Sequence, residues 1–264
     1  MSNVRRALAP LLVCLVALTL CTGCLGSDNP SAASTGTPDL GVCRTLTPDD
    51  VARPSNDSEP VDCSQEHTAQ TYAVGSLPSA LDHASYDADQ VATFAYRFCN
   101  ARFLAFTGAD ESLAMRTILS WAWFRPSEDA WKQGARWIRC DVVGGGDQTK
   151  TYVALPPDAK GLLLGRVADR WMVCAEGATV AGAVKVACDQ KHDWRAVTTI
   201  VLGQSKDPYP GDAAVQQRTK DFCSKSVGAW LNYPVDYDFG YSWFQSPEWD
   251  AGNRRSVCWA RTDR

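Results

Sequence analysis

Hydrophobic residues recur with the spacing of an amphipathic helix in two stretches of the chain. Between Asp87 and Gly108, apolar side chains return every three or four positions, which predicts a helix with one buried face. Asp87 with Gln90 three residues later has the pattern of a capping box, and Gly108 is typical of a helix end. A second stripe begins near Asp212. The apolar positions are Val91, Phe94, Ala95, Phe98, Cys99 and Phe103 in the first helix and Val215, Phe222, Cys223, Val227 and Trp230 in the second.

Segments rich in β-branched and aromatic residues flank both predicted helices. One such segment precedes each helix and two follow it, which predicts an α+β module built from a short antiparallel sheet and one helix. The expected strands are 68–77, 121–125 and 135–143 in the first half, and 196–202, 241–245 and 254–261 in the second. Two further stretches, 152–155 and 162–167, could open the second half as strands.

The eight cysteines that follow residue 24 divide into two sets of four, and short motifs repeat around them in the same order. The repeated patterns are V-x-C-x-Q-x-H, W-x-x-G-x-R-x-x-x-C and an aromatic pair at 123–124 and 243–244. We infer that the same module occurs twice, at 41–146 and 150–262, with the glycine-rich stretch 144–149 as the boundary. The repeated non-cysteine motif residues are His67, Trp131, Gly134 and Arg136, and His192, Trp249, Gly252 and Arg254.

The N-terminus has the pattern of an export signal. Arg5 and Arg6 precede an apolar run at 7–20, which is shorter than the roughly 20 residues of a membrane-spanning helix. Small residues before Cys24 resemble a bacterial lipoprotein signal, so we expect a signal peptide at 1–23 and a lipid on Cys24. The alternative is a plain cleaved signal peptide without lipid. The polar stretch 24–40, rich in Ser, Thr, Gly and Pro, predicts a disordered tether.

Exported cysteines meet an oxidising environment and form disulfides, so we expect two disulfides in each module. If both modules pair alike, three pairings remain open, and we favour first with second and third with fourth. Under this pairing, the third cysteine joins its helix to the sheet. The alternative is a zinc site, because Cys63 with His67 and Cys188 with His192 are both C-x₃-H. The favoured pairs are Cys43 with Cys63, Cys99 with Cys140, Cys174 with Cys188, and Cys223 with Cys258.

Charge and composition argue against some classes of protein. The chain has 26 basic and 30 acidic residues, a net charge of −4, whereas a nucleic-acid binder needs a basic face. A hydrophobic fraction of 45% argues against global disorder. The chain shows no G-x-S-x-G, H-E-x-x-H, P-loop or S-x-x-K signature. We therefore expect no enzymatic activity, no cofactor and no metal.

Two repeated features carry side chains that could bind or react. His67 and His192 could act as acid or base, but their duplication favours a local hydrogen bond within each module. Trp131 and Trp249, each with an arginine five residues on, could form a platform for sugars or carboxylates. We favour a structural role, with each Trp packed under a glycine turn and the arginine stacked over it.

The cysteine spacing and the two motifs resemble the septum formation-related domain of actinobacterial envelope proteins, which are often lipoproteins or single-span membrane proteins. The residues that carry the resemblance are Gly41-Val42-Cys43, Val61-Asp62-Cys63 with His67, Cys99, and Trp131, Gly134 and Arg136 with Cys140, together with their second-module counterparts. This resemblance implies a role in septum formation or the cell envelope. It implies no catalytic residues.

We therefore expect a non-enzymatic envelope protein that is anchored to the outer face of the bacterial plasma membrane through its lipid. Its partner would be another envelope protein, and no nucleic acid. The alternatives are a module that binds cell-wall glycan through exposed tryptophans and, less favoured, an extracellular hydrolase. Burial of Trp131 and Trp249 would remove the best residues for stacking on glycan.

Overall fold

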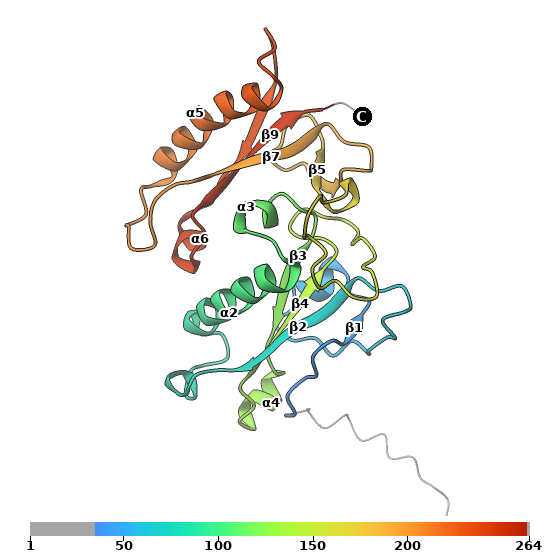
Figure 1. Ribbon diagram of the computed structural model, residues 1–264. Helices are drawn as coiled ribbons and strands as arrows, with labels where there is room; N and C mark the ends of the chain where they lie inside the picture. The colour runs from blue at the N-terminus through green and yellow to red at the C-terminus, as the bar shows by residue number, and fades with distance from the viewer. Residues whose placement is uncertain (1–34, 263–264) are drawn as a thin grey trace, which may run out of the picture. The chain divides into compact units, whose positions relative to one another are not determined.

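Two antiparallel sheets and two long helices dominate the α+β fold of the computed structural model, which describes residues 35–262 (Figure 1). The predicted signal peptide, Cys24 and most of the predicted tether lie outside the described residues. The first sheet comprises β1 (Cys43–Arg44), β2 (Ala69–Ser76), β3 (Ser120–Phe124) and β4 (Trp137–Val143). The second comprises β5 (Val173–Glu176), β6 (Val184–Ala187), β7 (Trp194–Val201), β8 (Phe239–Ser242) and β9 (Arg255–Arg261).

The long helices, α2 (Asp89–Thr107) and α5 (Asp212–Trp230), each lie between the first and second predicted strand segments of their module. Within 35–262 no helix combines the length and apolar character needed to cross a membrane. The short helices are α1 (Pro48–Val51), α3 (Glu111–Ala114), α4 (Glu128–Lys132) and α6 (Ser246–Ala251), and 3₁₀ turns occur at Ser79–Leu81 and Asp169–Trp171.

The two sheets share one topology. The first has the order β1-β2-β4-β3, and the second contains the same order as β5-β7-β9-β8 with β6 added at its edge. Val61 bridges Cys43 in the first module, and Val186 pairs with Cys174 in the second. A register shift follows Thr71 in β2, and the equivalent shift lies between Ala196 and Thr198 in β7. The repeat inferred from the motifs is therefore also a repeat of strand pairing.

Each long helix covers one face of its sheet because its buried positions recur at helical spacing. Ala95, Cys99 and Phe103 are buried on α2, whereas Phe94 and Phe98 are only partly buried. Gly108 ends this helix in the left-handed region, with φ of 77°, as predicted. The buried positions of α5 are Val215, Thr219, Cys223, Val227 and Gly228.

The helix predicted to start near Asp87 does form, but the capping box predicted there is wrong. The helix begins at Asp89, and the capping position is Ala88, whose side chain has no hydrogen-bonding group. The Asp87 carboxylate instead pairs with the Arg125 guanidinium at 2.6 Å. An ion pair to a residue far along the chain has replaced the local cap.

The predicted strands at 152–155 and 162–167 are also wrong, since both stretches are irregular. The Leu155 amide donates to the carbonyl of His67 at 2.8 Å, and the Leu163 amide donates to the last residue of α2 at 2.9 Å. These amides therefore bond to separate parts of the first module rather than to one neighbouring strand. Both leucines are buried, which explains the apolar pattern that was interpreted as strand.

The aromatic pair at 243–244 is not the structural counterpart of the pair at 123–124. Trp123 lies opposite the cysteine of β4, whereas Tyr241 lies opposite the cysteine of β9. Strand β8 accordingly ends before the second aromatic pair, two residues earlier than that alignment requires. A strand does form in the region predicted at 241–245, but it lies at Phe239–Ser242.

The two modules are joined by backbone hydrogen bonds and by a shared core. The Ile118 amide donates to the Trp171 carbonyl at 2.9 Å, and the Val173 amide donates to the Arg116 carbonyl at the same distance. Residues Ala33–Arg264 cluster as one compact unit. The shared core includes Phe103, Ile118 and Val142 of the first module and Val173, Trp194 and Trp259 of the second.

Candidate functional site

Four disulfides brace the two modules, and their pairs are those that the sequence favoured. Two of them join a long helix to a strand: Cys99 of α2 to Cys140 of β4, and Cys223 of α5 to Cys258 of β9. The other two, Cys43 with Cys63 and Cys174 with Cys188, close the loop that follows the first strand of each module. Disulfides of this number are typical of exported or extracellular proteins.

The repeated histidines lie inside the turns that follow these loops. The Nδ1–H of His67 donates to the carbonyl of Gln65 at 2.8 Å, and that of His192 donates to the carbonyl of Gln190 at 2.7 Å. Both rings are buried. Each histidine therefore closes its own turn, which is the local role predicted for it.

The zinc alternative lacks its thiolates. The sulfurs of Cys63 and Cys188 are both bonded to other cysteines, and a zinc site needs them deprotonated and free. Across residues 35–262, no group of three or more His, Cys, Asp or Glu side chains is placed to hold a metal ion.

The W-x-x-G-x-R motif forms the same packed turn in both modules. Trp131 and Trp249 are only 6% and 3% exposed. The Arg136 guanidinium lies 4.1 Å from the ring centroid of Trp131 and donates to its carbonyl at 2.8 Å. Arg254 lies 3.6 Å from the ring centroid of Trp249 and also donates to that residue's carbonyl.

The glycine between each Trp and Arg explains the shape of the turn. Gly134 has φ of 98° and Gly252 has φ of 123°, which residues with a Cβ rarely adopt. The Trp faces are consequently taken up by the arginine and the core. They are not open for stacking on a sugar, which weakens the glycan-binding alternative.

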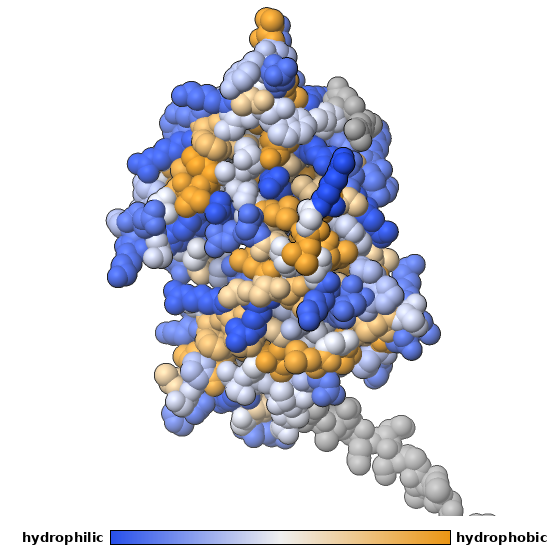
Figure 2. All heavy atoms as spheres, viewed as in Figure 1, coloured by the Kyte–Doolittle hydropathy of each residue, from blue (hydrophilic) through white to orange (hydrophobic). Residues whose placement is uncertain are grey.

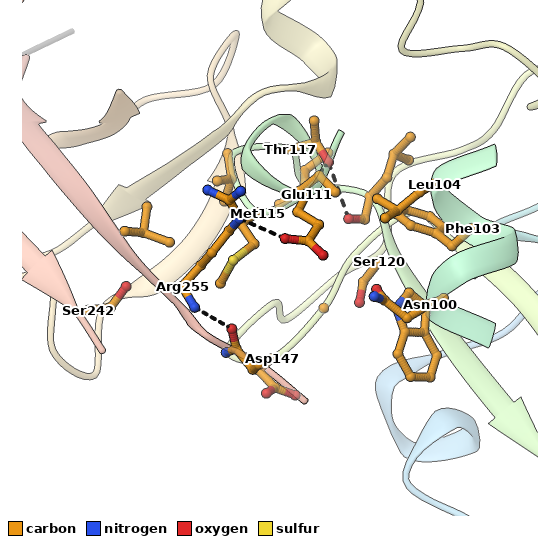
Figure 3. Close-up of a pocket in the computed structure, with 18 of the residues that line it drawn as sticks. Asn100, Phe103, Leu104, Glu111, Met115, Thr117, Ser120, Asp147, Ser242 and Arg255 are labelled. Carbon is orange, nitrogen blue, oxygen red and sulfur yellow. Dashed lines mark hydrogen bonds and ion pairs between the residues drawn. The ribbon is translucent and has the colours of Figure 1, made fainter. Parts of the chain in front are cut away.

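A cavity of about 490 Å³ lies between the two modules (Figure 3). In the first module its wall comes from α2, α3, β3 and the stretch between α3 and β3, together with the segment after β4. In the second module it comes from β5, β6, β8, β9 and the turn before β9. Figure 3 shows Phe103, Leu104 and Asn100 on one side, Ser242 and Arg255 on the other, and Glu111 between them. This volume is within the range of about 300–1,000 Å³ that is usual for small-molecule sites.

The cavity exists because the loop after the first strand differs in length between the modules. In the first module, Cys43 and Cys63 are 20 residues apart, and the segment between them places Leu46 and Val51 against Phe124 and its neighbours. In the second module the corresponding separation is only 14 residues. The shorter loop leaves Val257 and Trp259 of β9 on the cavity wall.

Charged groups occupy two parts of this cavity. Glu111 accepts a hydrogen bond from Nε of Arg255 at 2.9 Å, which joins α3 of the first module to β9 of the second. The ammonium of Lys185 lies 4.2 Å from the ring centroid of Trp259. Burial lowers the pKa of Lys185 to about 8. Burial is also the main cause of the raised pKa of Tyr96, and the nearby negative charges of Glu248 and Glu111 raise it further.

Sequence reasoning did not find these cavity residues. Glu111, Lys185 and Arg255 are charged residues in separate parts of the chain, and none is one of the residues that repeat between the modules. One signal was present in the sequence: the first cysteine gap of the second set is shorter than that of the first. A shorter covering loop predicts a less covered sheet.

A second feature is the loop that connects α5 to β8, residues 230–237, here called the aromatic loop (Figure 1). Tyr233 is 76% exposed and Val235 is 98% exposed, and Trp230 and Tyr237 are also exposed. Apolar atoms are visible at the end of this loop in Figure 2. The Tyr237 hydroxyl donates to the carbonyl of Ser224 at 2.6 Å and so holds the loop against α5.

Comparison with known proteins identifies one family. The model of the Septum formation family matches residues 26–124 and again residues 116–258. This is not a known family of enzymes. No curated protein and no solved structure matches the chain. The two matches cover most of the chain and both sheets, so the chain belongs to the Septum formation family, which indicates a role in septum formation.

Proposed function

We propose that this protein is a non-enzymatic component of the cell envelope that contributes to septum formation or envelope assembly by binding another protein. The observation that carries the proposal is the aromatic loop. Its residues Trp230, Tyr233, Val235 and Tyr237 make up four of the seven large hydrophobic side chains that are exposed among residues 35–262. Tyr and Trp are enriched where protein interfaces concentrate their binding energy.

The aromatic loop is held in place before any partner binds. The disulfide from Cys223 to Cys258 fixes α5 on β9, and the hydrogen bond from Tyr237 to Ser224 fixes the end of the loop on α5. A preorganised loop loses less conformational entropy on binding than a flexible one. Its large exposed side chains are therefore suited to protein binding.

The four disulfides support export, and the proposed lipid on Cys24 would hold the protein at the outer face of the plasma membrane. The proposed flexible tether, 16 residues beyond Cys24, would span roughly 20–24 Å and would keep the modules close to the membrane surface. A protein in this position can reach membrane-anchored partners at the septum. Replacing Cys24 with Ala should move the protein from the membrane fraction to the soluble exported fraction, whereas a plain cleaved signal peptide predicts no such shift.

Site-specific photocrosslinking tests the role of the aromatic loop. A photoreactive residue is placed at Tyr233 or, as a control, at the exposed Gln133 of the first module. We expect a discrete adduct from position 233 that is absent from position 133. The double variant Y233N/V235S should lose this partner and its septal localisation while its melting temperature stays within about 2 °C, because both side chains are solvated. Equal crosslinking at both positions, or a double variant that localises normally, would overturn the proposal.

A further inference from the structure

Lys185 is a partly buried cation that forms no ion pair with the residues the structure describes. Its Nζ lies over the ring of Trp259 and within 3.5 Å of a single hydrogen-bond acceptor, the carbonyl of Val180. None of the ion pairs formed within residues 35–262 includes this lysine. An ammonium has three donors, so two of them are available to a ligand.

Three of the other charged groups on the cavity wall already have partners. Glu111 and Arg255 pair with each other, and Arg254 stacks on Trp249 and donates to backbone carbonyls. Asp147 also lines the cavity, but its side chain is exposed and forms no ion pair with Lys185. Among the cations that line the cavity, Lys185 has the fewest partners within residues 35–262.

Apolar side chains also line the cavity, beginning next to this charge. Ile118 and Leu119 of the first module and Val257 and Trp259 of the second all line the cavity. A ligand that bridges these groups and Lys185 must carry an apolar body and a negative group. A purely apolar ligand would leave the ammonium unpaired, and a purely anionic one would leave the apolar wall hydrated.

We propose that the cavity between the modules binds a small amphiphilic anion, with its charged group on Lys185 and its apolar body against Trp259 and the shared core. The ligand would contact both modules and so stabilise their junction. This site is separate from the aromatic loop, and the proposal does not depend on the proposed function.

The burial of Lys185 agrees with such a role. A charged group that loses hydration without gaining a counter-charge destabilises the fold, and groups of this kind concentrate at functional sites. Replacing Lys185 with Met keeps the length of the side chain and removes the charge. We expect K185M to melt no lower than the wild type at pH 7, so a loss of binding in this variant would not reflect misfolding.

The test uses the disulfide-bonded exported chain and octanoate as the probe. Octanol lacks the charge, inorganic phosphate lacks the apolar body, and octylamine reverses the charge. Binding is followed by calorimetry and by mass-spectrometric mapping of amine labelling at Lys185. We expect octanoate to bind and to slow labelling of Lys185 at least tenfold, whereas the three comparison compounds should not.

The matched control variant is K191M, because Lys191 is in the same module but is exposed and pairs with Glu176. K185M should weaken octanoate binding at least tenfold, and K191M should leave it unchanged. Equal binding of octanoate by K185M and wild type would overturn the proposal. So would the absence of octanoate binding, or protection of Lys185 by phosphate equal to that by octanoate.

The pH dependence gives an independent readout. The ammonium form is required for binding, so affinity should be constant below pH 8 and fall about tenfold per pH unit above it. The other charged groups that line the cavity are Glu111, Asp147, Arg254 and Arg255. Burial raises the pKa of Tyr96 above its ordinary value, so this group does not compete with Lys185 near pH 8. An affinity that does not change from pH 7 to 10 would contradict the role of Lys185.

Discussion

The two modules have the same strand order, but different kinds of side chain occupy the sheet face that points away from the long helix. In β4 of the first module, this face carries Arg139 and Asp141, which form a buried ion pair at 3.1 Å. In β9 the register-equivalent residues are Val257 and Trp259. The first module thus closes this face with its own loop and charges, whereas the second exposes apolar side chains to the cavity and to the first module.

This difference shows how a duplicated module can produce a junction. The first module covers its face with the segment around α1, so it needs no neighbour there. The second module has a shorter loop, and α3 of the first module reaches its face instead: Ser112 Oγ and Thr199 Oγ1 are 2.8 Å apart. The cavity is the part of this face that α3 does not fill.

The largest loss of stability is expected on removing the buried ion pair of the first module. Asp141 accepts a hydrogen bond from Thr71 at 2.7 Å and pairs with Arg139, and Arg44 donates to the same threonine. Asp141→Ala would leave the buried guanidinium of Arg139 without its carboxylate and the hydroxyl of Thr71 without its acceptor. We expect a loss of about 3–5 kcal/mol in the free energy of unfolding, measured by chemical denaturation.

The control for this change replaces both charges together. Arg139→Met with Asp141→Leu removes both members of the ion pair, so neither of them is left buried without the other, and the result imitates the apolar face of the second module. We expect this double variant to be more stable than Asp141→Ala. If the single variant unfolded at the wild-type denaturant concentration, the buried pair would not be the element that closes the first module.

The next largest loss of stability is expected on removing the helix-to-strand disulfides. This loss should be similar in the two modules. Their sequence separations are 41 and 35 residues, and loop entropy assigns each about 3–4 kcal/mol with a difference of only ~0.1 kcal/mol. We therefore expect C99A/C140A and C223A/C258A to lose similar stability in denaturation. A clearly larger loss in one module would show that the contacts around its disulfide, and not the loop, determine the effect.

Much of this architecture was predictable because it depends on local patterns. The helical stripes identified α2 and α5, and the repeated cysteines identified the modules and favoured the pairs that the structure forms. Burial of Trp131 under Arg136 followed from the glycine turn between them. In each of these cases, the residues that interact are close in sequence or are marked by repetition.

The remaining features depend on contacts between distant segments. Asp87 has a capping pattern but pairs with Arg125, 38 residues away. Leu155 and Leu163 have an apolar alternation, yet they pack as irregular segments on the first module. The cavity brings together Glu111, Lys185 and Arg255, and no periodicity or motif connects these positions. Sequence patterns therefore predicted the modules but not their junction.

The smallest effect is expected at the ion pair that joins the modules. Glu111 is more than half exposed, so its interaction with Arg255 is well screened by water and should contribute about 0–1 kcal/mol. Glu111→Gln keeps the shape of the side chain and removes the charge. We expect a melting temperature within about 3 °C of wild type, with a difference that shrinks in high salt. Lys132→Gln, which removes the exposed pair with Asp129 inside the first module, is the control. A much larger loss for Glu111→Gln than for the control would mean that the junction depends on this pair rather than on the shared apolar core.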